Sequence, residues 1–489
     1  MGNCHKDSSG GAPRKPKAKQ AAAALTADRS DMEREALAPT NTQDSGEHSQ
    51  RGETSQRPRN EPNGTLGQPK RRRKNFKIAS LNMNGRGTCS QDKWGSISSL
   101  IKRRRVAVLG LQETHPNEEM QETIGKRFRN TLYLVHSADP GDPSATGGVS
   151  IAIHKGTVNT KNITHRVIIP GRVILAEIPW DKGERLCIMN VYAPTKNVDK
   201  TEFWERLLET IKDDEDLQPD ILMGDFNLVE NPEIDRLNNR KGSDPSAVRR
   251  AVTELTTELN MTDGWRRRHP KKRGYTFMGN SQSRLDRIYT TEDVYPWCSD
   301  WKIEHPGFKT DHSLVSTQVT LENMPFIGRG RWMIPINLLK NRQLKKETQE
   351  LARELQTRVE QTTLTDHATG NPQLALKLFK MEVVKLYQRH QKTHRLRLEN
   401  AIKSLQRELE DKASAPNLLV DEIQEHTILI VERIEALERK RRDKTRLLSS
   451  MRNRLEGETM SKYWVRSAKE ATPQDTIRGL RNPLGDMSW

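Results

Sequence analysis

Short apolar runs alternate with longer amphipathic stretches between residue 76 and about residue 320. The longer stretches predict helices at 92–104, 117–129, 199–214 and 246–259. The short runs predict strands at 76–81, 106–111, 131–136, 148–154, 172–178, 186–192, 219–224, 285–290 and 313–320. Many strands with few helices favour an α/β (α+β) fold in which two sheets pack face to face, with helices outside.

The two ends of the chain differ from this central region of 75–322. Residues 1–74 are rich in small, polar and charged residues and contain almost no aromatic or β-branched residues, so a disordered arm is expected. The arm ends in the basic run 70–74, which fits a nuclear-import signal, a nucleic-acid contact or a solvated tail. Nuclear localisation is therefore an expectation.

The region 323–489 is expected to be mainly helical. Long charged helices are expected at 374–412 and 420–456, and the turn signal Ser414-Ala415-Pro416-Asn417 between them favours an antiparallel hairpin. The preferred role for these helices is a linker or a coiled-coil surface, with self-association through 374–456 as a further expectation.

The formal net charge of +17 implies a polyanionic partner, either nucleic acid or an anionic membrane. Four cysteines without a CxxC pair argue against a zinc knuckle and a disulfide framework, and they fit a reducing compartment. No apolar run approaches the roughly 18 residues that a membrane span needs. No membrane-spanning segment is therefore expected, while nucleic acid and an anionic surface both stay open as partners; the family resemblance given below implies DNA and no membrane.

Polar residues that can do chemistry follow the carboxyl ends of several expected strands. Carboxylate and amide oxygens suit Mg²⁺, with Mn²⁺ as the alternative ion, and such an ion can neutralise a phosphate. A histidine beside carboxylates can activate water, while asparagine can donate to phosphate oxygens. Singly, each residue is better explained as a turn or a helix cap, but the ordered set predicts a phosphodiesterase site. Its members are Asn82, Asn84, Glu113, Tyr192, Asp225, Asn227, Asp286, Asp311 and His312.

These motifs resemble those of the endonuclease/exonuclease/phosphatase, or deoxyribonuclease I-like, superfamily. Within it they are most similar to the apurinic-like endonuclease domain of non-LTR (LINE-like) retrotransposons, including fungal elements of the Tad type. The resemblance covers 75–322 and implies a four-layer α/β sandwich. It is carried by Leu81-Asn82-Met83-Asn84-Gly85, Gln112-Glu113-Thr114-His115, Gly147-Gly148-Val149, Val191-Tyr192-Ala193-Pro194, Gly224-Asp225-Phe226-Asn227, Tyr275-Thr276-Phe277, Arg284-Leu285-Asp286 and Asp311-His312-Ser313.

The resemblance also implies a role for each residue. Glu113 is the expected principal metal ligand, with Asn82 beside it and Asp311 near the ion. Asp225 is expected to position or deprotonate the attacking water. His312 acts either as the base or as a stabiliser of phosphorane charge. Asp286 is expected to orient that histidine. Asn227 and Tyr192 are expected to contact the phosphate.

Two departures from the repair-type enzymes matter. Those enzymes carry Asp at the position of Asn84, and they tend to carry Trp at the position of Ser283. Both departures favour nicking of ordinary or unusual DNA over abasic-site repair. DNA contacts are expected from residues that flank the site, namely Asn84, Tyr275, Arg284, Lys271, Lys272 and Arg273.

The expected function is metal-dependent endonucleolytic cleavage of DNA. Two alternatives stay open, a phosphoinositide or sphingomyelin phosphodiesterase of the same fold and a catalytically silent nucleic-acid-binding relic. Tyr463-Trp464 and 477–483 resemble the linker that precedes the reverse transcriptase in such elements. No polymerase signature follows, which suggests a truncated element or a gene model that ends early.

Overall fold

The computed structural model describes part of the chain in detail. The ranges are 72–73, 75–85, 90–115, 117–143, 147–179, 185–237, 244–279, 282–320, 326–327, 332, 334, 336–362, 371–414, 420–456, 464–465, 468–473, 480–481 and 487–488. Nearly all of the expected basic arm, the turn residues Ala415, Pro416 and Asn417, and Tyr463 lie outside these described residues.

Two six-stranded sheets form the centre of the folded region. One has the order β14 (Cys298–Glu304), β15 (Leu314–Val319), β2 (Phe76–Asn82), β3 (Val106–Gln112), β5 (Val149–His154) and β4 (Leu132–Ser137). The other has the order β10 (Met261–Asp263), β13 (Asp286–Thr291), β9 (Ile221–Asp225), β8 (Arg185–Tyr192), β7 (Val173–Pro179) and β6 (Thr164–Ile169). In both sheets only one neighbouring pair is parallel, β2 with β3 and β8 with β9.

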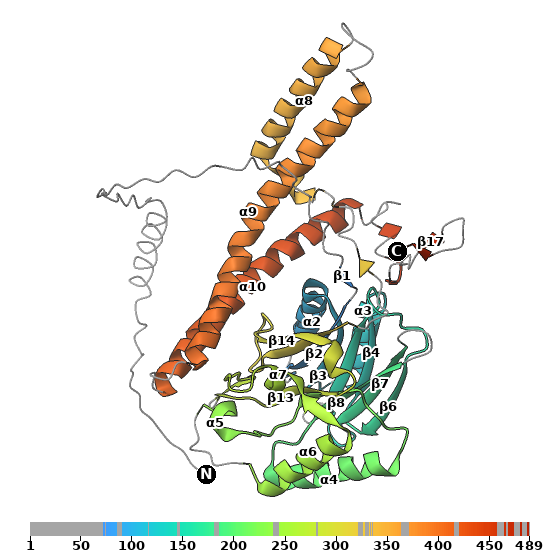
Figure 1. The fold of residues 1–489 in the computed structure, drawn as a ribbon, viewed down its shortest axis with the longest axis vertical. Coiled ribbons are helices and arrows are strands. Elements are labelled where there is room, and N and C mark those ends of the chain that lie inside the picture. The colour runs from blue at the N-terminus through green and yellow to red at the C-terminus, as the bar shows by residue number, and fades with distance from the viewer. Residues whose placement is uncertain are drawn as a thin grey trace, which may run out of the picture. The chain divides into compact units, whose positions relative to one another are not determined.

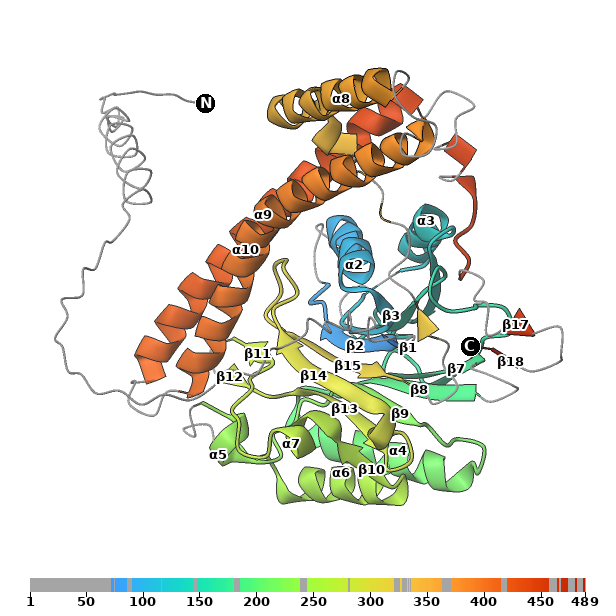
Figure 2. The same ribbon diagram turned by 45° about the horizontal axis from the view of Figure 1, so that its top comes forward.

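The sheets pack on each other, and helices cover their outer faces (Figures 1 and 2). Apolar side chains such as Ile78 and Val108 from one sheet and Ile188 and Met223 from the other share one core. A second core lies under α4 (Asn197–Asp213) and α6 (Ser246–Glu258), and a third under α2 (Ser90–Arg104) and α3 (Glu118–Phe128). The result is the four-layer α/β sandwich that was expected, because each sheet buries both of its faces.

Short elements complete the sandwich around the ends of the strands. They are α5 (Pro232–Asp235), α7 (Gly264–Arg268), the paired strands β11 (Phe277–Met278) and β12 (Gln282–Ser283), and the 3-10 helix η2 (Tyr295–Trp297). A two-stranded pair joins β1 (Arg72–Arg73) to β16 (Phe326–Ile327), and another joins β17 (Leu480–Arg481) to β18 (Met487–Ser488).

Beyond the sandwich the described chain is mostly helical. The 3-10 helix η3 (Ile336–Lys340) leads into α8 (Arg342–Thr362), which packs on α9 (Pro372–Ser414), and α9 in turn packs on α10 (Val420–Glu456) (Figure 1). The bounds of α10 are those expected from the sequence, whereas α8 was not expected. Among the described helices, none combines the length and the apolar character that crossing a bilayer requires.

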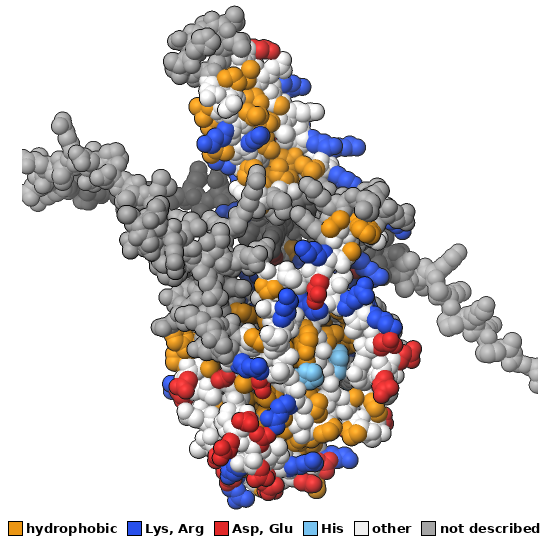
Figure 3. Space-filling model, turned by 90° about the vertical axis from the view of Figure 1, so that its right-hand side faces the viewer, with side chains coloured by type: hydrophobic (Ala, Val, Ile, Leu, Met, Phe, Trp, Pro, Cys, Tyr) orange, Lys and Arg blue, Asp and Glu red, His pale blue; other side chains and the backbone are white. Residues whose placement is uncertain are grey.

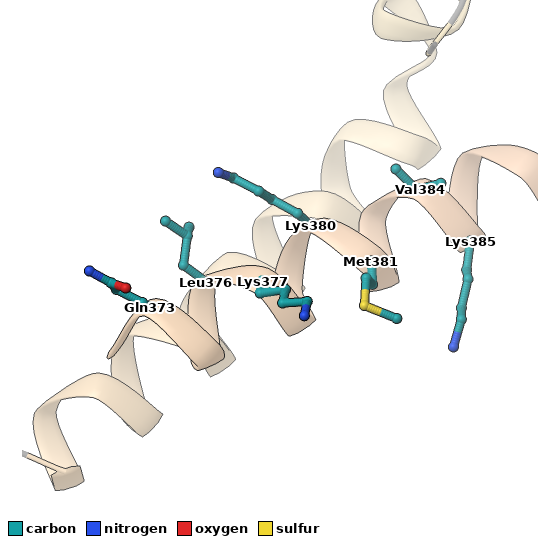
Figure 4. A pocket seen from close by; sticks show the side chains of 7 residues that line it. All are labelled: Gln373, Leu376, Lys377, Lys380, Met381, Val384 and Lys385. Atoms are coloured by element: carbon teal, nitrogen blue, oxygen red, sulfur yellow. The ribbon is translucent and has the colours of Figure 1, made fainter. Parts of the chain in front are cut away.

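Near its start, α9 exposes an apolar strip between lysines. Leu376, Met381 and Val384 line a shallow pocket together with Gln373, Lys377, Lys380 and Lys385 (Figure 4). None of the candidate site residues borders this pocket, so it is not the site at which the expected chemistry takes place.

Candidate active site

The two parallel strand pairs bring the candidate residues to one end of the sandwich. Asn82 ends β2 beside Gln112 of β3, and Tyr192 ends β8 beside Asp225 of β9. Because parallel neighbours have their carboxyl ends at the same sheet edge, each pair presents its polar residues together. Asp286 begins the antiparallel strand β13 directly opposite Asp225, which adds a second carboxylate to that edge.

Asn82 joins the two sheets through its amide. Its Nδ2 donates to Glu113 Oε1 at 3.1 Å and to Asp225 Oδ2 at 3.0 Å. The Tyr192 hydroxyl donates to the same Glu113 oxygen at 2.9 Å. Burial alone would raise the pKa of Glu113, but contacts with His115, Asn82 and Tyr192 outweigh burial and lower that pKa to about 2. Glu113 is therefore ionised at neutral pH.

A second group links Asp286, His312 and Asp225. His312 Nδ1 donates to Asp286 Oδ2 at 2.8 Å, and His312 Nε2 lies 3.9 Å from Asp225 Oδ2. Burial disfavours a charged imidazole, but the charge of Asp286 and this hydrogen bond outweigh burial and raise the pKa of His312 to about 10. Burial also raises the pKa of Asp225, and the charge of Asp286 adds to that effect.

Two further asparagines hold the loops on either side. Asn84 Nδ2 donates to Asp311 Oδ1 at 3.1 Å, which joins the loop after β2 to the loop before β15. Asn227 Nδ2 donates to the Ala193 carbonyl at 2.8 Å, and its backbone N–H donates to Asp225 Oδ1 at 3.0 Å. All nine residues of the predicted phosphodiesterase set thus lie in one region of connected side chains.

The backbone in this region takes conformations that ordinary residues avoid. The φ angles of Asn84, Glu113, His115 and Asn227 are 45°, 51°, 40° and 48°. Left-handed conformations cost a non-glycine residue about 1–2 kcal/mol, although asparagine tolerates them better. Gly224 is required for a different reason, since a Cβ there would lie 1.9 Å from the Val191 carbonyl oxygen.

Some residues at the site received no role from the sequence. His115 is buried, and its Nε2 lies 4.0 Å from Glu113 Oε2. Thr276 Oγ1 accepts hydrogen bonds from the N–H groups of Leu285 and Asp286 at 2.9 Å, which fixes the start of β13. The Thr310 hydroxyl donates to the Asn82 carbonyl at 3.0 Å. Each of the three lies within or beside a predicted motif. That position in the sequence is the signal by which they could have been identified as site residues.

The donor set fits a divalent cation at Glu113. Asn82 and Tyr192 both donate to Oε1 of this carboxylate, whereas Oε2 lies 4.0 Å from His115 Nε2 and would be the oxygen that holds an ion; the side chain is 17% exposed. Asp311 is only partly buried and lies on the loop joined to Asn84, so it is a candidate for a second hard oxygen ligand. Asp225, Asp286 and His312 also place possible ligand atoms within 4.8 Å of one another. In that group of three residues, however, His312 Nδ1 is already bound to Asp286. We therefore assign these residues to proton transfer and charge stabilisation, and not to metal binding.

Comparison with known proteins places this site in a family. The profile of the Endonuclease/Exonuclease/phosphatase family matches residues 79–317. These residues belong to that family. The match spans both six-stranded sheets almost from β2 to the end of β15, and it includes every member of the predicted phosphodiesterase set. The endonuclease/exonuclease/phosphatase domain is accordingly of a nuclease or phosphoesterase type.

Individual relatives each resemble about half of the chain. The chain is 26% identical over 253 residues to an uncharacterized 149 kDa protein of transposon TX1 from Xenopus laevis. That match covers 50% of this chain and 18% of the relative, so the chain spans less than a fifth of the relative's length. An AP endonuclease structure from Archaeoglobus fulgidus is 22% identical with a TM-score of 0.41, covering 50% of this chain and 98% of its own. The endonuclease domain of TRAS1, a telomere-specific non-LTR retrotransposon, is 17% identical with a TM-score of 0.37, covering 51% and 100%.

Two of the DNA contacts expected in this domain are contradicted by burial. Arg284 is 1% exposed, with Nε 2.8 Å from Asp235 Oδ1 and Nη1 2.5 Å from Asp263 Oδ2. Tyr275 is 2% exposed, and its hydroxyl is buried as well. Neither side chain has surface with which to contact DNA. Arg284 instead joins α5 to the start of α7 and so supports Asp286, two residues further on.

This correction predicts a stability effect for Arg284. We expect Arg284→Ala to lower the free energy of unfolding by about 3 kcal/mol, because Asp235 and Asp263 would lose a buried, hydrogen-bonded partner and keep only Arg266 and Arg287 beside them. Arg250→Ala is the matched control, since Arg250 is exposed and its ion pair with Glu254 is worth at most about 1 kcal/mol. Urea denaturation measures both. Unchanged stability with weakened DNA binding in Arg284→Ala would restore the DNA-contact role.

The expected basic contacts lie on a tethered loop. Arg266 Nη1 donates to the carbonyls of His269 and Lys272 at 3.0 and 2.8 Å, which pins the loop that carries Lys271, Lys272 and Arg273. Lys271 is exposed, whereas Lys272 Nζ lies 2.6 Å from Glu410 Oε2 of α9. Basic and acidic side chains are interspersed on the face in Figure 3, so that face is not uniformly basic.

Proposed function

We propose that this protein is a divalent-metal-dependent endonuclease that hydrolyses phosphodiester bonds of DNA. The observation that carries the proposal is the Asn82 amide, which bridges the ionised Glu113 and the buried Asp225. This bridge sets a metal-binding carboxylate and a proton-accepting carboxylate side by side. The formal net charge of +17 supports a polyanionic substrate.

The chain's own residues divide the work of hydrolysis. Water attacks the phosphorus, and its proton passes to the Asp225 carboxylate, whose raised pKa increases its affinity for that proton. The P–O3′ bond breaks, and the leaving oxygen takes up a proton from solvent to give a 3′-hydroxyl. Asn227 has a second side-chain N–H for a non-bridging oxygen, because among the described residues its Nδ2 donates to the Ala193 carbonyl alone.

His312 is assigned to charge stabilisation. Because its pKa is raised to about 10, the imidazole is protonated at neutral pH and can donate from Nε2 to the phosphorane oxygens. Asp286 holds the ring through Nδ1, which orients Nε2 toward Asp225 and the reacting phosphate. This assignment favours the stabiliser over the base among the two roles expected for His312.

Glu113 and Asp311 would hold the cation, with Asn82 beside them. When bound, a Mg²⁺ or Mn²⁺ ion would neutralise charge on the scissile phosphate and support the leaving oxygen. Tyr192 keeps Glu113 in place through its hydroxyl, and Asn84 does the same for Asp311. These second contacts fix the orientation of the carboxylates before an ion arrives.

We further propose that the domain nicks target DNA for a mobile element and acts in the nucleus. Support comes from the sequence similarity to the transposon TX1 protein. Ser283 is buried in the β11–β12 pair, where the repair-type enzymes tend to carry Trp. A small residue at this position fits cleavage of DNA that has no abasic site. Asn84, which donates to Asp311, is the second departure from the repair-type enzymes and favours the same substrate.

A plasmid assay with the full chain tests the function. We expect the protein to convert supercoiled plasmid to the nicked form with Mg²⁺, and we expect excess EDTA to stop the conversion because Glu113 then has no ion to hold. Restoring Mg²⁺ in excess over EDTA should restore nicking. Nicking that persists in EDTA would contradict the metal role.

Three parallel assays separate the alternatives. Duplexes with and without one abasic site should be cut at similar rates if the enzyme does not act in repair. Hydrolysis of phosphoinositide or sphingomyelin liposomes without DNA cleavage would instead favour a lipid phosphodiesterase. Salt-sensitive DNA binding without nicking at any Mg²⁺ or Mn²⁺ concentration would favour a silent binding protein.

A further inference from the structure

Three residues on one face of α10 contact the endonuclease/exonuclease/phosphatase domain. Glu435, Glu438 and Arg442 follow one another at spacings of three and four, which places them on a single helical stripe. Glu435 Oε1 lies 3.6 Å from His305 Nε2, and Arg442 Nη1 donates to the Ser96 hydroxyl at 3.1 Å. Glu438 lies between them in the helix and makes the most buried contact of the three.

Glu438 is an acidic residue enclosed almost completely by the fold. Its side chain is 2% exposed, although such a group is normally solvated. Arg103 Nη1 of α2 lies 3.2 Å from Oε2, and Arg441 Nη2 donates to both oxygens at 2.5 and 2.6 Å. Two guanidinium groups, one from each side of the interface, therefore balance the buried charge.

Gly307 provides the space into which Glu438 fits. A Cβ at this position would lie 2.9 Å from Glu438 Cγ and 3.0 Å from Cδ. The φ angle of Gly307 is 88°, a conformation that other residues rarely adopt. The close approach and the backbone conformation thus both call for glycine where the acidic side chain enters.

The loop that contains Gly307 leads directly to the candidate active site. Residues 305–312 form all but the last residue of the connection from β14 to β15, and α2 holds the start of this loop through Arg104 Nη2, which donates to the His305 carbonyl at 2.6 Å. Phe308 is buried in the core under α2. The loop then passes Thr310, bound to Asn82, and ends in Asp311 and His312.

We propose that Glu438 is a positioning residue for the nuclease: by docking on Arg103 and Gly307, it holds loop 305–312 so that Asp311 and His312 lie correctly at the site. The proposal rests on the proposed function and deepens it. It makes α10 a working part of the enzyme, in contrast to a spacer. The contact between Glu410 and Lys272 supports it, since α9 reaches a second loop beside the site.

The test uses full-length protein and two kinds of measurement. Glu438→Ala should lower kcat for plasmid nicking about tenfold to a hundredfold with little change in KM, because supporting contacts of a catalytic centre carry effects of that size. Amide hydrogen exchange in 305–310 should become faster in the same variant, and this readout does not need catalysis. Glu438→Gln keeps the shape of the side chain and two of its possible hydrogen bonds. Its kcat and its exchange rates should lie between those of the wild type and those of Glu438→Ala.

Matched variants separate docking from general damage. Glu432→Ala removes an exposed glutamate from the same helix and should change neither measurement. Arg103→Gln should reproduce the effect of Glu438→Ala from the other side of the contact. The double variant should then be no slower than the worse single variant, because both changes remove one shared interaction. Circular dichroism confirms that α10 is still helical.

The outcomes distinguish the proposal from the function on which it rests. Equal exchange rates in Glu438→Ala and Glu432→Ala would overturn docking, whether or not the protein nicks DNA. Faster exchange with unchanged kcat in an active enzyme would overturn positioning. If the wild-type chain does not nick, faster exchange at 305–310 specific to Glu438→Ala still supports the docking, while the proposed endonuclease function fails.

Discussion

Replacing Glu113 with Ala should reduce plasmid nicking by about a thousandfold. The ion that this carboxylate is proposed to hold would contribute several kcal/mol of charge stabilisation, and each 1.4 kcal/mol changes a rate about tenfold. The same substitution leaves the Tyr192 hydroxyl and one Asn82 N–H without their acceptor. The rate is measured with purified full-length protein at saturating Mg²⁺.

The control for this prediction is Glu209→Ala, which removes an exposed glutamate from α4. This control should nick at the wild-type rate. A fold defect in Glu113→Ala would show as a lower midpoint in urea denaturation, which separates it from a loss of chemistry. A variant that is stable and still nicks within tenfold of the wild type would show that Glu113 is not the principal ligand.

Replacing His312 with Ala should slow nicking by about a hundredfold to ten-thousandfold. Effects of that size accompany the loss of a positioned proton donor or acceptor. Since His312 is proposed to stabilise charge in the transition state, kcat should fall while KM for plasmid changes little. Asp286→Asn should give a smaller loss, because the ring would keep a hydrogen-bond partner but lose the charge that raises its pKa.

An exposed histidine provides the comparison. His165 lies on β6, away from the described hydrogen bonds of the site, and His165→Ala should leave kcat unchanged. Single-turnover cleavage measures the chemical step directly. Wild-type single-turnover rates in His312→Ala would remove this residue from the mechanism and leave Asp225 as the main catalytic group.

The sequence predicted the buried strands and missed strands at the sheet edges. β6, β10 and β14 were not expected, and each ends its sheet. Four of the six residues of β6 are exposed, so neither an apolar run nor an alternating pattern marks it. An alternating apolar and polar pattern arises only where one face of a strand is buried. Few residues of these three edge strands are buried, so the pattern is missing.

The site was predicted well where its residues follow strands, and less well where burial decides the role. Asn82 and Glu113 lie together because the parallel strands β2 and β3 share an edge, which the sequence can indicate, and Asp225 meets them because the second sheet packs on the first. Arg284 was misread as a DNA contact because its partners Asp235 and Asp263 are distant in sequence. Nothing local to an arginine tells whether acidic residues elsewhere will enclose it.

One partner of α10 was expected from the sequence, and another was not. The helix has the expected bounds Val420–Glu456 and packs on α9 as the expected hairpin does, but its expected role as a linker or a coiled-coil surface included no contact with α2. Glu438 looks like any surface glutamate in the sequence, and only the fold brings Arg103 and Gly307 to it. Charge patterns along a helix show which face is polar, and they do not show whether another part of the chain covers that face.

The left-handed backbone at Glu113 has a consequence for laboratory evolution. Its φ angle of 51° is one that glutamate rarely adopts, so the hydrogen bonds from Asn82 and Tyr192 offset a backbone cost at the residue proposed to bind the cation. A screen that rewards only heat resistance or soluble expression would therefore favour changes that remove this backbone cost together with the two donors, and it would enrich for inactive variants. Thermostable forms of this domain should be selected under a simultaneous requirement for cleavage.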